Sequence, residues 1–225
     1  MIVEALAIIF GYLVGRRRAR RARRKIVSIN FGVVADSFAL SARAAALVGA
    51  GLGFLLFRKF DSILEILAFA ILCGMCIEHT LTDFYTHKLV RSTTRRAAII
   101  GAPLLILAAL KRAVDFEAGV ILVMFASFVV VLVIFTVLAR VSRGGIGSGD
   151  VRLAAVLAMF LAYLGAQYVV LGLALGCILG GLVAAAMLLI GRASRSTPIA
   201  FGPYLCLGAV ALVIGGQQVT NFLGV

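Results

Sequence analysis

Two aspartates, Asp83 and Asp150, have the most unusual surroundings of any acidic residues in the sequence. Asp83 directly follows the apolar segment 62–82, and Asp150 directly precedes the apolar segment 151–169. Asp150 also ends a glycine-rich stretch, GGIGSGD, that separates two long apolar runs. An ionisable residue at the edge of such a run is costly unless it faces a bundle interior or a water-filled cavity. The two carboxylates are therefore the first candidates for chemistry.

If the two carboxylates meet, they cannot both ionise easily, because like charges at close range repel. One carboxylate could then remove a proton from water while the other donates a proton to a substrate carbonyl, as in aspartic proteases. Peptide hydrolysis by this route needs no metal, no organic cofactor and no covalent intermediate. Ordinary helix caps or loop charges remain the alternative interpretation of the same two residues.

The glycines beside Asp150 give this hypothesis a place for a substrate. A backbone without side chains would let an extended peptide lie close to the carboxylate; these residues are Gly144, Gly145, Gly147 and Gly149. Asp150 lies where a helix begins, and there the helix dipole favours the charged form. Asp83 lies where a helix ends, and there the dipole favours the neutral form. The sequence thus favours Asp150 as the ionised partner and Asp83 as the proton holder.

The elements that must position these residues are membrane-spanning helices. The chain has 225 residues, 63% of them hydrophobic and 14% charged, with a mean hydropathy of +1.15, whereas soluble domains are about 45–50% apolar. The apolar runs approach the roughly 20 residues of a spanning helix and lack the alternation of barrel strands. We predict an all-α polytopic bundle in a single domain over 1–225, with about eight spans, six or seven being possible. The expected spans are 2–15, 42–57, 62–82, 97–114, 118–139, 151–169, 171–191 and 201–222.

The distribution of positive charge predicts the orientation of these spans. The formal net charge is +13, and an arm at 16–28 is rich in arginine. With this arm in the cytoplasm, alternating spans leave only four Lys and Arg residues outside, as the positive-inside rule requires; these are Arg58, Lys59, Lys111 and Arg112. We therefore expect both termini outside and both aspartates at the cytoplasmic side. Arg16–Lys25 is expected to bind anionic lipid headgroups, and no nucleic acid.

Three stretches of the sequence resemble one known family. GIGSGDVRL carries Gly147, Ser148, Gly149 and Asp150 and resembles the GxGD motif of intramembrane aspartic proteases. Its VRL continuation is similar to that of bacterial type IV prepilin peptidases. TDFYTHKLVRSTT places Asp83 and Thr86 at the positions of that family's other aspartate motif.

The third stretch, TPIAFGPYLCLGA, contains Gly202 and Pro203 and closely resembles a late segment of the same family. This resemblance implies a bacterial inner-membrane aspartic endopeptidase with Asp83 and Asp150 as its catalytic pair. The implied substrate is a prepilin or pseudopilin, whose short basic leader is cleaved after a glycine on the cytoplasmic side. The motif glycines, Ser148, Thr86 and Pro203 would shape the site, and no metal or cofactor is implied.

The sequence departs from the family pattern at two places. Val90 stands where the family usually has proline. The larger members also carry a cytoplasmic zinc domain with two CxxC pairs after the first span, where this chain has only the basic arm. The resemblance is therefore better to the short members of tight-adherence (Flp-type) pilus systems, and it leaves N-methyltransferase activity open.

Two functions from other classes stay open. A small ion-coupled transporter could relay protons or cations through the same aspartates, and a non-catalytic component of pilus assembly would tolerate their loss. Cys73 and Cys76 form a CxxC pair that we interpret as packing residues within an apolar helix rather than zinc ligands. Glu78 is expected to be a buried partner of a polar group or a substrate contact, and His79 a histidine satisfied within the bundle.

Overall fold

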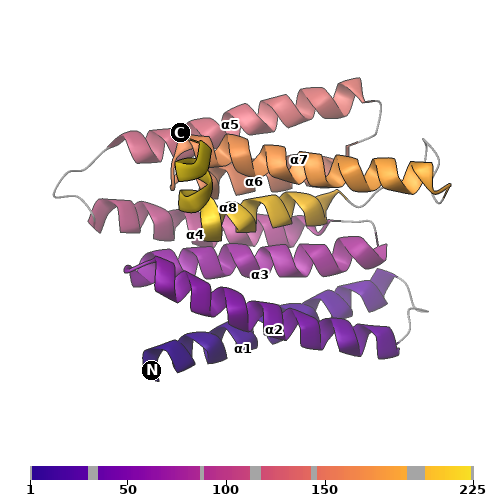
Figure 1. Cartoon of the computed structure of the whole chain (residues 1–225), viewed down its shortest axis with the longest axis horizontal. Coiled ribbons are helices and arrows are strands. Elements are labelled where there is room, and N and C mark those ends of the chain that lie inside the picture. Colours follow the sequence, from indigo (N-terminus) through magenta and orange to yellow (C-terminus); the bar gives the residue numbers. More distant parts are fainter. Residues whose placement is uncertain are drawn as a thin grey trace. The chain divides into compact units, whose positions relative to one another are not determined.

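The computed structural model describes residues 2–29, 35–86, 89–111, 118–142, 146–191 and 201–223, which form helices joined by short non-helical segments (Figure 1). The predicted all-α class is confirmed, and the described parts contain no strand. The helices found in these ranges are α1 (Ile2–Ile29), α2 (Ala35–Lys59), α3 (Ile63–Thr86), α4 (Arg91–Lys111), α5 (Ala118–Val141), α6 (Ser148–Ala162), α7 (Ala166–Leu189) and α8 (Gly202–Leu223).

Six of the helices within the described ranges are long and apolar enough to cross a membrane: α2 from Ser41, α3, α4, α5 from Gly119, α7, and α8 as far as Asn221. This number lies within the range that the sequence predicted. α1 falls outside the set because its second half is strongly basic, and α6 because it has only 15 residues. The chain is thus a multi-pass membrane protein, and the orientation with both termini outside stays a prediction.

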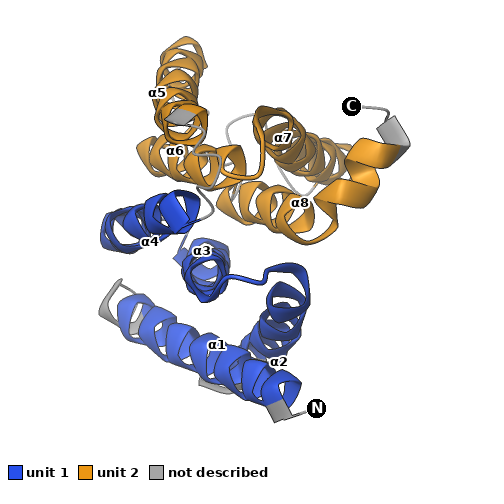
Figure 2. Ribbon diagram, turned by 90° about the vertical axis from the view of Figure 1, so that its left-hand side faces the viewer, with its two compact units in different colours: residues 1–116 blue, residues 117–225 orange. Residues whose placement is uncertain are grey.

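The chain divides into two compact units, residues 1–116 and 117–225 (Figure 2). Each unit is described by itself below. The single domain over 1–225 that the sequence suggested stays a prediction.

In the first unit, α3 lies among the other three helices, with α4 on one side and α1 and α2 on the other (Figure 2). α1 and α2 approach so closely that backbone faces backbone. A methyl group added at Gly11 would lie 2.2 Å from the carbonyl oxygen of Gly49, and one at Gly15 would lie 2.3 Å from that of Ala45. Small residues at such crossings let membrane helices pack without intervening side chains.

The sequence analysis expected the first span to end at residue 15, before the basic arm. α1 instead continues through the arm as one helix to Ile29. Arginine, alanine and lysine are all good helix formers, so nothing in this segment ends the helix. Its inner side carries the buried residues Ala19, Ala22 and Ile26. The arm is therefore a packed part of the first unit, and its arginines do not form a loose loop.

In the second unit, α6 packs against α5, α7 and α8, and nearly all of its residues from Val151 onward are buried. The predicted span 151–169 is wrong at its end, because α6 stops at Ala162. Gly165 adopts φ +142°, a backbone conformation that breaks the helix and is open mainly to glycine. α7 then begins at Ala166, five residues before the predicted span.

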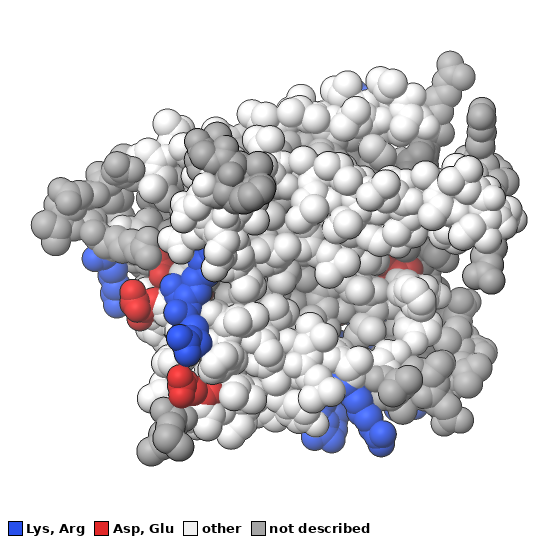
Figure 3. All heavy atoms as spheres, viewed as in Figure 1, with Lys and Arg blue, Asp and Glu red and all other residues white. Residues whose placement is uncertain are grey.

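One face of the protein is largely uncharged where it is described. On the face shown in Figure 3, Lys, Arg, Asp and Glu side chains are confined to small areas, and most of the face is neither acidic nor basic. Large apolar side chains are exposed along the whole of α5, among them Leu122, Phe125, Val133 and Val141. Since soluble proteins rarely expose large contiguous apolar areas, this surface fits contact with lipid chains.

Candidate active site

Asp83 lies in the last turn of α3 and is 4% exposed. The helix was expected to end at residue 82, but it runs on to Thr86. Two hydroxyl groups bond to backbone carbonyls at this end of the helix: Thr82 Oγ1 donates to the carbonyl oxygen of Glu78 at 2.8 Å, and Thr86 Oγ1 donates to that of Thr82 at 2.6 Å. Thr86 is therefore the last residue of this helix. Residues 87–88, which follow α3, lie outside the described ranges.

A second helix contacts the same turn of α3. Tyr85 Oη and Ser41 Oγ of α2 lie within hydrogen-bond distance, at 2.7 Å. Phe84, between Asp83 and Tyr85, is 71% exposed, and its ring meets the Tyr85 ring edge-on. The Asp83 turn is thus held by α2 while it presents an aromatic side chain outward.

Asp150 lies in the first turn of α6, as the sequence predicted, three residues after the N-cap residue Gly147. Its Oδ2 accepts a hydrogen bond from the backbone N–H of Gly147 at 3.2 Å. This is half of a capping box, since a side chain at the third position of the helix satisfies the N–H of the N-cap residue. The helix dipole also favours a negative charge at this position.

The motif glycine next to this carboxylate has a steric reason to be glycine. A methyl group added to Gly147 would lie 3.0 Å from Asp150 Oδ2, too close for the carboxylate to keep its position. Ser148, the first residue of α6, is exposed, and Gly149 is half-buried like Asp150. Gly144 and Gly145 lie outside the described residues.

Gly202 and Pro203 begin α8, in agreement with the span predicted over 201–222. Pro203 has no N–H to leave unsatisfied in the first turn of a helix, where proline is well tolerated. The preceding Phe201 packs its ring against α7, where a methyl group added at Gly180 would lie 2.6 Å from the ring. The late motif thus fixes the contact between α7 and α8 in the second unit. Residues 192–200 lie outside the described ranges.

Glu78 is a buried partner of polar groups, which is one of the roles predicted for it. His79 was expected to be fully satisfied, but among the described residues its Nδ1 has no hydrogen-bond partner. Glu78 is ion-paired with Arg18 and Lys25 of α1. His79 Nε2 and Thr94 Oγ1 lie 2.9 Å apart. Arg18 and Lys25 belong to the arm that was predicted to bind lipid, but their side chains contact α3. The sequence analysis did not foresee this pairing.

No metal centre is formed by the His, Cys, Asp and Glu side chains that the structure describes, none of which gather in groups of three or more. All four cysteines are free thiols. Cys73 and Cys76 are buried in α3, in accordance with the packing role predicted for them. The donor set needed for zinc is thus not found in the described ranges.

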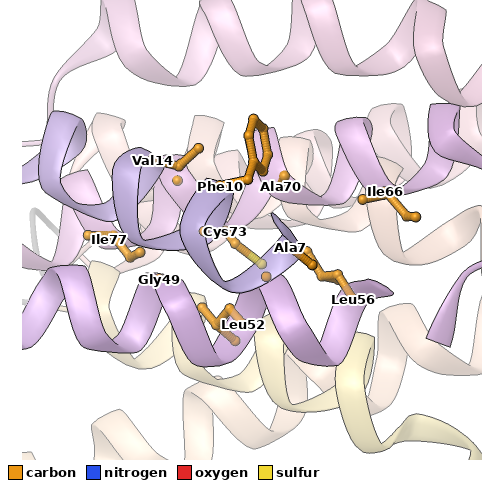
Figure 4. A pocket seen from close by; sticks show the side chains of 13 residues that line it. Ala7, Phe10, Val14, Gly49, Leu52, Leu56, Ile66, Ala70, Cys73 and Ile77 are labelled. Atoms are coloured by element: carbon orange, nitrogen blue, oxygen red, sulfur yellow. The ribbon is translucent and has the colours of Figure 1, made fainter. Parts of the chain in front are cut away.

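The first unit contains one notable cavity, between α1, α2 and α3 (Figure 4). Its volume is about 40 Å³, and its lining is apolar, with Phe10, Leu52 and Cys73 among the residues that form it. Apolar cavities of this size stay dry. None of the predicted site residues lines it.

The two aspartates belong to different units, Asp83 to the first and Asp150 to the second. Their environments are therefore defined one at a time, and their meeting as a pair stays a prediction. Each environment taken alone suits a carboxylate that works at the end of an apolar helix.

Comparison with known proteins gives three relatives of one name, prepilin leader peptidase/N-methyltransferase. The protein of Bacillus subtilis (strain 168) is 29% identical over 86 residues, which is 38% of this chain and 34% of the relative. That of Stutzerimonas stutzeri is 39% identical over 82 residues, 36% of this chain and 27% of the relative. That of Pseudomonas aeruginosa is 35% identical over 79 residues, 35% of this chain and 26% of the relative.

The aligned segment of the chain spans about a third or less of the length of these relatives. No protein-family model matches the chain, and no solved structure matches it. The three relatives support the prepilin peptidase family, the same family that the three sequence motifs resemble.

Proposed function

We propose, from this kinship with the prepilin peptidases, that the chain is an aspartic endopeptidase that removes the leader of prepilins or pseudopilins. Asp83 and Asp150 are its catalytic pair. The observation that carries the proposal is the placement of Asp150, whose carboxylate is held at the N-terminus of α6 by the glycine of a GxGD motif. The buried position of Asp83 at the end of another apolar helix supports it.

The proposed reaction is direct hydrolysis by water between the two carboxyl groups. The ionised carboxylate removes a proton from water, whose oxygen bonds to the carbonyl carbon of the peptide. The protonated carboxyl group donates its proton to the carbonyl oxygen. The C–N bond then breaks, and the new amine takes the proton that was removed from water. The second carboxyl group regains its proton from the former carbonyl oxygen. Methyl transfer is no part of this reaction.

The proposed substrate has a basic leader that ends in glycine, followed by an apolar helix. Such a helix would lie in the bilayer and bring its cytoplasmic end to the depth of the two aspartates. The proposed location is therefore the bacterial inner membrane, with the active site facing the cytoplasm.

Anionic lipid headgroups are a further proposed partner, at the outer face of α1. Six arginines of this helix are exposed: Arg16, Arg17, Arg20, Arg21, Arg23 and Arg24. Each basic residue near an anionic membrane surface contributes about 1 kcal/mol of binding. These six would therefore anchor the arm to the membrane surface, while Arg18 and Lys25 face the protein.

The test is cleavage of a co-expressed prepilin by the wild type and by Asp83→Asn and Asp150→Asn, with the membrane level of each protein measured. Both variants are expected to insert normally and to leave the leader uncut. Asp61→Asn is the matched control, because Asp61 is an exposed aspartate just before α3, and it should cut like the wild type. Cleavage by either catalytic variant at the wild-type rate would contradict the pair and favour a transport or assembly role.

A further inference from the structure

Glu78 is the centre of a buried polar cluster, here named the Glu78 cluster, made of Glu78, Arg18, Lys25 and Thr93. Glu78 is 1% exposed, and its Oε2 accepts a hydrogen bond from Arg18 Nη1 at 3.1 Å. Its Oε1 accepts hydrogen bonds from Lys25 Nζ and, at 2.7 Å, from Thr93 Oγ1. Lys25 Nζ also donates to Thr93 Oγ1 at 2.7 Å. The cluster therefore joins three helices, α1, α3 and α4.

The chemistry of the cluster indicates a role in alignment rather than in stability. A buried ion pair is often no more stabilising than well-packed apolar residues of the same volume, because removing both charges from water is costly. Its geometry is nevertheless demanding, since each oxygen of Glu78 has a specific donor. Buried polar groups of this kind can specify how helices are aligned with one another. Loss of Glu78 would leave two partly buried cations without their counter-charge.

The cluster lies next to the turn that carries Asp83. Asp83 lies five positions after Glu78, which is about 7.5 Å along a helix axis. Thr82, directly before Asp83, donates to the carbonyl oxygen of Glu78. His79 lies four residues before Asp83, on the same side of α3, and pairs with Thr94 of α4. Consecutive residues of α3 thus bond to consecutive residues of α4, which fixes both the rotation and the axial position of α3.

We infer that Glu78 is a positioning residue, which with Arg18 and Lys25 of the basic helix holds α3 in the rotation that the Asp83 carboxylate needs for catalysis. This inference rests on the proposed function. It gives the basic segment two roles on two faces: outward arginines toward headgroups, and inward Arg18 and Lys25 toward the active-site helix.

The first test compares the kinetics of Glu78→Gln with those of the wild type, on membrane-inserted enzyme and a purified prepilin. A misplacement of about 1 Å can cost about 100-fold in rate, so kcat should fall about 10- to 100-fold while KM stays within about twofold. Lys25→Gln keeps Arg18 and Thr93 on Glu78 and should show a smaller loss of the same kind. Arg96→Gln is the matched control, because it removes one positive charge from an exposed position of α4, and it should be unaffected.

A compensating variant separates positioning from contact with the substrate. Glu78→Gln combined with Arg18→Gln and Lys25→Gln removes the uncompensated cations and leaves amides that can bond to one another and to Thr93. Activity should recover to within a few-fold of the wild type. A rise in KM without this recovery would mean that Glu78 binds the leader itself, and would overturn the inference. Unchanged kcat in both Glu78→Gln and Lys25→Gln would overturn it as well.

Hydrogen exchange of residues 79–86 without substrate provides a readout that is independent of proteolysis. Glu78→Gln is expected to accelerate exchange there, with no change at the N-terminus of α6. If this variant fails to insert, Lys25→Gln takes its place. Unchanged exchange would overturn the inference whether or not the enzyme cuts prepilin. If the wild type cuts no prepilin while exchange responds as expected, the proposed function fails and only the alignment of α3 by the cluster remains.

Discussion

The turns that carry Asp83 and Asp150 hold their carboxylates in opposite ways. Asp83 is buried, and its turn is fixed by side chains from other helices, with Ser41 of α2 on Tyr85 and the Glu78 cluster one turn earlier. Asp150 is half-buried, and its carboxylate accepts a hydrogen bond from a backbone N–H three residues away in its own turn. One position depends on tertiary packing, and the other on local backbone geometry.

This difference predicts which substitutions disturb each of the two turns. The Asp83 turn should respond to changes far away in the sequence, because its supports come from α1, α2 and α4. The Asp150 turn should respond strongly to changes within the motif, since its carboxylate is bonded to the N–H of a motif glycine. Three substitutions test this comparison.

The largest effect is expected where the two sites should behave alike. Asp83→Asn and Asp150→Asn should each reduce the cleavage rate by about 10²- to 10⁴-fold, since each removes one half of the proton transfer. The double variant should be no slower than either single variant, because residues that act as one unit are not additive. Single-turnover cleavage of a purified prepilin measures all three. Losses that multiply in the double variant would show that the two carboxylates work separately.

An intermediate effect is expected from Gly147→Ala, which tests the local support of Asp150. The backbone of Gly147 has φ −71° and ψ 147°, which alanine adopts without strain, so any effect comes from the added methyl group 3.0 Å from the carboxylate oxygen. We expect about a tenfold loss of cleavage, equal to about 1.4 kcal/mol, with normal insertion.

The control for this substitution is Gly181→Ala in α7, where an added methyl group meets nothing within 4 Å. Alanine should be neutral or slightly stabilising there, because it is the better helix former. Gly147→Ala with full activity would mean that the capping contact does not set the position of Asp150.

The smallest effect is expected from Tyr85→Phe, which removes the hydrogen bond between α2 and the Asp83 turn. One such bond contributes about 1 kcal/mol, so exchange of the amides at 83–86 should accelerate by about fivefold. Exchange at 148–153 should not change. Tyr12→Phe, at an exposed tyrosine of α1, serves as the control. An equal response at both aspartate turns would contradict the contrast between remote and local support.

The features that could be predicted from the sequence are those set by neighbours in the chain. The contact of Gly147 with Asp150 spans three residues, so the motif itself contains the information that places the carboxylate at a helix N-terminus. The long apolar runs likewise predicted the all-α class and the range of span numbers, because composition alone decides which segments can cross a lipid bilayer.

The features that were missed depend on partners far apart in the chain. Arg18 and Lys25 lie 60 and 53 residues from Glu78, and no spacing rule connects such residues. Their arginine-rich surroundings indicated a lipid-facing arm and concealed the inward face of the same helix. The end of α6 was missed because Tyr163 and Leu164 continue its apolar pattern, and only the backbone conformation of Gly165 shows the break.

The separation of Glu78 from its two cations has a consequence for biosynthesis. Arg18 and Lys25 leave the ribosome 60 and 53 residues ahead of their carboxylate, which at 5–20 residues per second is a delay of roughly 3 to 12 seconds. During this interval Glu78 is not yet present to pair with Arg18 and Lys25. The nascent α1 therefore carries its full positive charge while its orientation in the membrane is being set. Only when α3 arrives can two of these charges pair with Glu78, so under the predicted topology the same residues would first direct insertion and later complete the folded unit.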